Sequence, residues 1–130
     1  MKNSALILVM VFSFQLLWSQ EHLAGFRHDK MYGFINEKGE VAIEAQYQTV
    51  KDFHNGLARV KKDAYWGMIN KNGEMIIEAR YVNLYDFHDG LARARTGMNW
   101  GFIDKQGNWV IEEKYYHCKD FSEGLARIRT

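Results

Sequence analysis

The sequence predicts an all-β fold: a tandem repeat array of three 34-residue antiparallel β-meander units plus a closing strand. Short runs of alternating apolar and polar residues, separated by glycine-containing turns, are typical of β-strands. A fixed period in this range indicates that each unit buries its apolar face against its neighbours. An aromatic residue followed by glycine marks the period three times, as Tyr32-Gly33, Trp66-Gly67 and Trp100-Gly101.

The same spacing sets the boundaries of the units. Ile43, Ile77 and Ile111 keep it, and so does the Gly-Leu-Ala-Arg segment that begins at Gly56 and Gly90. In this register the units span about residues 23–56, 57–90 and 91–124, and the closing strand spans 125–130.

Residues 1–19 lie outside the repeat register and have the features of a secretory signal peptide. Lys2 gives a short basic region, and the apolar run from Ala5 to Trp18 is too short to span a membrane comfortably. Cleavage after Ser19 would leave a repeat domain at 20–130. We expect an exported protein, periplasmic, cell-surface or secreted, without a membrane span after signal removal. A buried core helix and a retained signal anchor are the alternatives.

Charge and cysteine content exclude several classes of function. The chain has 17 basic and 16 acidic residues, so removing Lys2 leaves 16 of each. A neutral repeat domain lacks the basic face that nucleic acid requires, so no nucleic-acid partner is predicted. The one cysteine, Cys118, cannot form an internal disulfide, and we expect it to be buried.

The first two strands of each unit form a hairpin. Residues 57–61 alternate, which places Ala58 and Val60 on one face and Arg59 and Lys61 on the other. A short polar turn leads to the second strand, which contains the aromatic-glycine pair.

The turn after the second strand is the best-specified feature of the unit. An Asn or Asp begins it and a glycine closes it, which predicts a type I turn with the glycine left-handed, in a three-residue hairpin loop. A two-residue type I′ turn would suit Asn72-Gly73 but fits the other copies poorly. The closing glycines are Gly39, Gly73 and Gly107.

A third strand, such as residues 75–78, is followed by a ten-residue connection to the next unit. Each connection carries one Tyr and one Phe, which we expect to pack over the sheet instead of contacting a ligand. The connections end at Gly56, Gly90 and Gly124.

These motifs resemble the WG-repeat (KWG) family, whose units carry Trp-Gly, an Asp/Asn-x-x-Gly turn, an Ile-rich strand, a Tyr and Phe-x-x-Gly-Leu-Ala. The resemblance covers residues 23–130. It departs at Tyr32, which replaces Trp, and at Glu44, Glu78 and Glu112, where the family often has proline. The resemblance implies β-rich repeats common in bacterial proteins and suspected of binding roles, without a defined reaction.

Neither catalysis nor a cofactor or metal site is predicted. The chain contains no nucleophile elbow, phosphate-binding loop, HExxH or CxxC motif. Asp52 with His54 and Asp86 with His88 suggest a metal pair, but the third copy has Ser122 in place of the His. Capping of backbone N–H groups accounts for this spacing better.

Repeated charges give the candidate partner-binding residues. One interpretation is a row of solvent-facing cations that binds an acidic protein partner. The other is an ion-pair ladder with Glu44, Glu78 and Glu112 that keeps the sheet soluble. The row consists of Arg59, Arg93, Arg127, Lys61, Arg95 and Arg129.

The predicted function is therefore a non-catalytic interaction module that binds protein at the cell envelope or outside the cell. The alternative is a glycan-binding or cell-wall-binding module that uses the repeated aromatics. An exposed row of Trp rings would favour glycan, whereas buried rings with an exposed Arg/Glu surface would favour protein.

Overall fold

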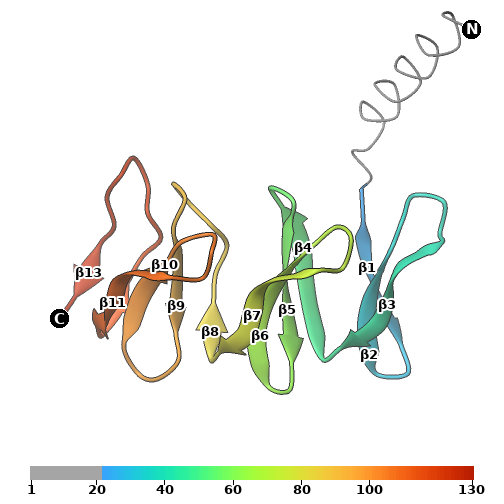
Figure 1. Ribbon diagram of the computed structural model, residues 1–130, viewed down its shortest axis with the longest axis horizontal. Helices are drawn as coiled ribbons and strands as arrows, with labels where there is room; N and C mark the ends of the chain where they lie inside the picture. The colour runs from blue at the N-terminus through green and yellow to red at the C-terminus, as the bar shows by residue number, and fades with distance from the viewer. Residues whose placement is uncertain (1–21) are drawn as a thin grey trace, which may run out of the picture.

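The computed structural model describes residues 22–130, and every regular element in this range is a β-strand. The strands form a row of antiparallel sheets along the long axis of the molecule (Figure 1). The predicted all-β repeat array is therefore confirmed, whereas the predicted signal peptide lies outside the described residues. Within residues 22–130, no helix is long and apolar enough to cross a membrane.

The described residues form four sheets, each in simple chain order. The first contains β1 (Ala24–His28), β2 (Met31–Ile35) and β3 (Val41–Tyr47). The second contains β4 (Thr49–His54), β5 (Leu57–Lys62), β6 (Tyr65–Asn70) and β7 (Met75–Tyr81). The third contains β8 (Asn83–Leu84), β9 (Ala92–Arg95), β10 (Trp100–Ile103) and β11 (Trp109–Tyr115). The last contains β12 (His117–Cys118) and β13 (Ile128–Arg129).

The sequence predicted that the connections between units are loops. In the structure, each connection instead contributes a strand. These strands are β4, β8 and β12, and each pairs with the first strand of the following unit: β4 with β5, β8 with β9 and β12 with β13. Every sheet after the first therefore joins the end of one sequence unit to the start of the next. The aromatic residues of the connection do pack inward, since Tyr47 and Tyr81 are buried.

The turn between the second and third strands has the predicted geometry. Gly73 has a φ of +81°, and its N–H donates to the carbonyl oxygen of Asn70 at 3.0 Å. The Asn70 Oδ1 accepts from the N–H groups of Asn72 and Glu74 at 3.0 and 2.9 Å. A three-residue hairpin loop capped by an Asx side chain is therefore confirmed.

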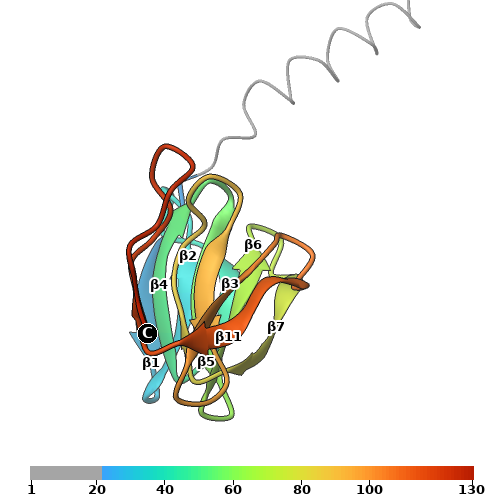
Figure 2. The ribbon, with the colours of Figure 1, turned by 90° about the vertical axis from the view of Figure 1, so that its left-hand side faces the viewer.

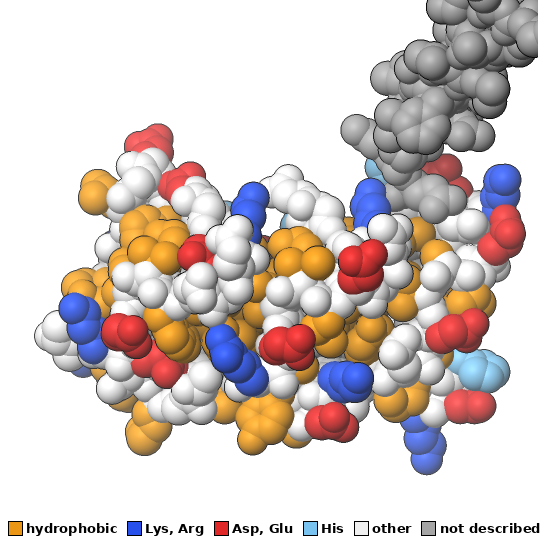
Figure 3. All heavy atoms as spheres, in the orientation of Figure 1, with side chains coloured by type: hydrophobic (Ala, Val, Ile, Leu, Met, Phe, Trp, Pro, Cys, Tyr) orange, Lys and Arg blue, Asp and Glu red, His pale blue; other side chains and the backbone are white. Residues whose placement is uncertain are grey.

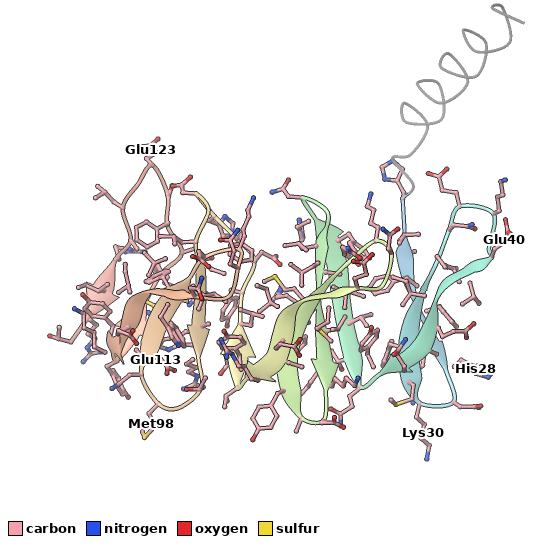
Figure 4. All side chains as sticks on the ribbon, in the orientation of Figure 1. His28, Lys30, Glu40, Met98, Glu113 and Glu123 are labelled. Carbon is pink, nitrogen blue, oxygen red and sulfur yellow. The ribbon has the colours of Figure 1, made fainter. Side chains whose placement is uncertain are left out.

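Two further sets of turns are two-residue hairpins with positive φ at both central positions, which is the type I′ pattern. One set follows β4 and its counterparts, as at Asn55-Gly56 (φ 50° and 80°). The other joins β5 to β6 at Asp63-Ala64 (φ 50° and 73°), without a glycine. The two sets lie at opposite edges of the array, as the positions of Glu123 on one edge and of Lys30 on the other show (Figure 4).

The glycine of each aromatic-glycine pair lies where the third strand crosses closely over the second. A Cβ atom at Gly67 would lie 2.4 Å from the carbonyl oxygen of Ile77 and 2.8 Å from the amide nitrogen of Ala79. Gly33 and Gly101 have equally short distances to the third strands of their own units. Glycine is therefore required at this position because only a residue without a side chain permits the backbone approach.

The apolar core is divided between neighbouring units. One cluster joins the first and second units, and another joins the second and third. Met68 and Ile69 are adjacent in β6 but enter different clusters, so a single strand connects both cores. The first cluster contains Phe34, Ile43, Tyr47, Ala58, Val60 and Ile69, and the second contains Met68, Ile77, Tyr81, Leu84, Ala92, Ala94 and Ile103.

Candidate interaction surface

Arg59 in β5 connects the second sheet to the third. Its Nε donates to the Oδ1 of Asp86 at 3.0 Å, and its Nη1 donates to the carbonyl oxygen of Leu84 at 3.1 Å. Both acceptors belong to the connection that supplies β8. The guanidinium group thus joins β5 to the segment leading into the third sheet.

Arg93 in β9 repeats this geometry one unit later, with Asp120 at 2.5 Å and the carbonyl oxygen of Cys118 at 3.1 Å. The side chains of Arg59 and Arg93 are only 18% and 14% exposed. The prediction that both belong to a solvent-facing row is therefore wrong, because the following connection folds over them.

Aromatic rings lie between these cations. The guanidinium carbon of Arg93 is 3.7 Å from the ring centroid of Tyr85, and that of Arg95 is 5.0 Å from the centroid of Trp100. The Nε of Arg95 also donates to the Oδ1 of Asn83 at 2.6 Å. Cation–π contacts at these distances stabilise the stack and cover faces of the rings.

The remaining aromatic-glycine pairs are likewise partly buried. Trp66 packs against the second core cluster and lies opposite Lys61 across the β5–β6 ladder. Tyr32, Trp66, Trp100 and Lys61 are all half-buried. The structure therefore shows neither an exposed Trp row nor a free cation row in the middle of the array.

The exposed cations of the predicted row lie in and beside β13, opposite β12. Arg127 and Arg129 are exposed, and so are His117 and Lys119, which the sequence prediction missed. His117 pairs with Arg129 in the ladder, and the N–H of Lys119 donates to the carbonyl oxygen of Arg127 at 2.8 Å. Alternation places all four side chains on one face. We call this set the cationic ribbon.

The cationic ribbon borders a shallow hollow of about 230 Å³, lined by His117, Lys119, Arg127 and Ile128. The repeat period could have indicated this set, because Lys119 occupies the position of Tyr85 and His117 that of Asn83. Figure 2, which looks along the array, shows the C-terminus on the same side of the molecule as β1 and β4, with β7 on the opposite side. On the face shown in Figure 3, acidic, basic and apolar side chains are intermixed.

The imidazoles contact carboxylates of the following unit, not of their own unit. The Nε2 of His54 lies 3.9 Å from the Oδ2 of Asp86, and that of His88 lies 3.6 Å from the Oδ2 of Asp120. The Asp52–His54 and Asp86–His88 pairs considered for metal binding are thus not formed, because each imidazole faces a carboxylate that an arginine already binds. Among the described residues, no group of three or more His, Cys, Asp or Glu side chains could hold a metal ion.

Cys118 is fully buried, as predicted. Burial raises the pKa of its thiol above the usual range; the nearby Arg93 opposes this shift and Asp120 adds to it. A second hollow, of about 110 Å³, lies between His54, Asp86 and Lys105. Its volume is well below the roughly 300–1,000 Å³ of ordinary small-molecule pockets.

Comparison with protein families finds the family described as WG containing repeat three times, at residues 32–66, 66–97 and 100–130. The chain belongs to the WG-repeat family. The matches cover most of the described residues, and the WG repeat accounts for the aromatic-glycine pairs that organise each unit. Comparisons with curated proteins and with solved structures each give no match.

Proposed function

We propose that this WG-repeat chain is an exported, non-catalytic interaction module that binds another protein at the cell envelope or outside the cell. The observation that carries the proposal is the covering of the aromatic stack. Guanidinium groups lie over Tyr85 and Trp100, so the rings offer little free surface for stacking on sugars. Cations on the remaining exposed surface suit carboxylates of a protein partner better.

A glycan-binding module is the second candidate, and one observation favours it. Tyr65 and Tyr116 are 46% and 61% exposed, and exposed tyrosine rings can stack on sugars. They occupy different positions in their units, however, so they do not form a repeated platform.

Export is tested by the intact mass of the protein recovered outside the cytoplasm. We expect a mature chain that begins at Gln20, because the repeat register leaves residues 1–19 outside the array. Recovery of all 130 residues from the soluble cytoplasm would contradict export.

Binding is tested by covalent capture. The purified protein, carrying a photoactivatable crosslinker, is incubated with envelope extract and the adducts are identified by mass spectrometry, while the same protein is applied to a glycan array. We expect a saturable protein adduct that unlabelled protein displaces. Specific glycan binding without a displaceable protein adduct would support the second candidate instead.

A further inference from the structure

The cationic ribbon differs from the equivalent ribbon of the preceding unit. There, Arg93 is bound by Asp120 and stacks on Tyr85, while Arg95 is bound by Asn83 and stacks on Trp100. The neutral partners Asn83 and Tyr85 are themselves part of that ribbon. One period later, His117 and Lys119 replace them.

This replacement leaves four cations or potential cations facing one another. Within residues 22–130, the side chains of His117, Lys119, Arg127 and Arg129 make no ion pair, hydrogen bond or ring contact. Like charges directly opposite each other in a ladder are destabilising. Carboxylates facing the ribbon would relieve this repulsion.

We propose that the cationic ribbon binds an extended acidic segment of the partner protein, with carboxylates at alternate residues. The proposal rests on the proposed protein-binding function and names its surface. Alternate residues of a strand are about 6.6–6.8 Å apart and point to the same side, so a Glu-x-Glu segment matches the spacing of His117 and Lys119. Guanidinium groups at Arg127 and Arg129 can each bind a carboxylate in bidentate fashion.

An acidic polysaccharide offers the same charge, but the ribbon suits it less well. Among the four residues of the ribbon there is no Trp, Tyr or Phe ring on which a sugar could stack, since Lys119 stands in place of Tyr85.

The test measures binding of a fluorescein-labelled peptide, acetyl-Glu-Ser-Glu-Ser-Glu, to the purified protein by fluorescence anisotropy. The Gln-Ser-Gln-Ser-Gln peptide and an oligogalacturonate serve as comparison ligands. We expect the acidic peptide to bind and the Gln peptide not to bind. The double variant Lys119→Gln/Arg129→Gln should weaken binding about tenfold, since two exposed charge pairs together contribute about that factor. It should also reduce the salt dependence.

The matched control is Lys38→Gln/Lys62→Gln, which removes the same charge from exposed positions elsewhere. It should bind the acidic peptide as the parent does, and circular dichroism should show both variants folded. Equal binding by both double variants, or binding of the oligogalacturonate without the peptide, would overturn the inference. If a protein partner is captured from envelope extract but the acidic peptide does not bind, the inference fails while the proposed function stands.

Discussion

Two neighbouring residues in each WG repeat have different roles. Trp66 is half-buried and packs against a core cluster shared with the following unit, whereas Gly67 permits the third strand to cross the second. The aromatic residue can vary, as Tyr32 shows in the first unit, because a ring of similar size fills the same space. The glycine cannot vary without moving the backbone.

Gly67→Ala should lower the free energy of unfolding by about 2–3 kcal/mol, because the new methyl group meets rigid backbone atoms of Ile77 and Ala79. Urea unfolding followed by tryptophan fluorescence measures this. Gly97→Ala is the control, since a Cβ atom there has no heavy atom within 4 Å. If the two variants are equally stable, the close crossing has been assigned wrongly.

Cys118 predicts a pH dependence of stability. Because burial raises the pKa of the folded thiol, the unfolded chain loses this proton first as the pH rises. The stabilisation is thus complete below the unfolded pKa, about 8.5, and is lost as the pH rises through the folded pKa. Between pH 7.5 and 9.5, the parent should lose more stability than Cys118→Ala in urea titrations. Equal losses in both proteins would contradict this account.

At the scale of single elements, the hairpin turns differ in how well their residues suit them. Gly73 and Gly56 occupy left-handed positions at no steric cost, but Ala64 has a φ of 73°. A residue with a Cβ atom is strained there, by about 1–2 kcal/mol. A substitution at Ala64, in the turn between β5 and β6, can therefore increase the stability of the folded protein.

Ala64→Gly should raise the free energy of unfolding by about 0.5–1 kcal/mol, because the strain removed exceeds the added chain entropy. Gly73→Val should lower it by about 1–2 kcal/mol, since a β-branched residue resists positive φ. Thermal unfolding measures both. Ala42→Gly, in an exposed strand position, controls for entropy alone and should destabilise. A destabilised Ala64→Gly variant would show that this turn carries no strain.

Local patterns predicted the first three strands and the turn that ends at Gly73, because alternation and turn chemistry are properties of a few adjacent residues. They did not predict β4, β8 and β12. β8 and β12 have only two residues each, and the β4–β5 pairing contains an irregularity between Val50 and Phe53. The strands with which β4, β8 and β12 pair also belong to the following unit. An interpretation of one unit at a time therefore assigns these three segments to a loop.

The candidate site was predicted only in part for a related reason. Alternation correctly placed Arg59 on the face opposite Ala58 and Val60, but it cannot show what covers that face. In the structure, Asp86 from the next connection covers it. Of the cationic ribbon, Arg127 and Arg129 were predicted, because they repeat the positions of Arg93 and Arg95. His117 and Lys119 were missed, because they lie in and beside the opposite strand and do not repeat a charge of the preceding unit.

For the whole molecule, the Arg–Asp contacts join one sheet to the segment that enters the next. Arg59→Met and Asp86→Asn should each lower the free energy of unfolding by about 1–2 kcal/mol, because each leaves a partly buried charged partner unsatisfied. A double-mutant cycle should give a coupling energy of about 1 kcal/mol, whereas the distant pair Arg59 and Asp120 should give none. Additive effects of Arg59→Met and Asp86→Asn would show that the contact does not couple the second and third sheets.

Since β4 and β8 are each donated forward by one unit to the next sheet, the internal junctions share one strand arrangement, although Gly25 stands at the first of them where Arg59 stands at the second. A gene duplication that adds one complete 34-residue period would therefore create a new junction already equipped with its arginine, aspartate and shared sheet. An insertion of another length would separate these parts. Lineages carrying such a gene can thus change the length of the array in whole units, while the exposed residues of each copy diverge toward new partners.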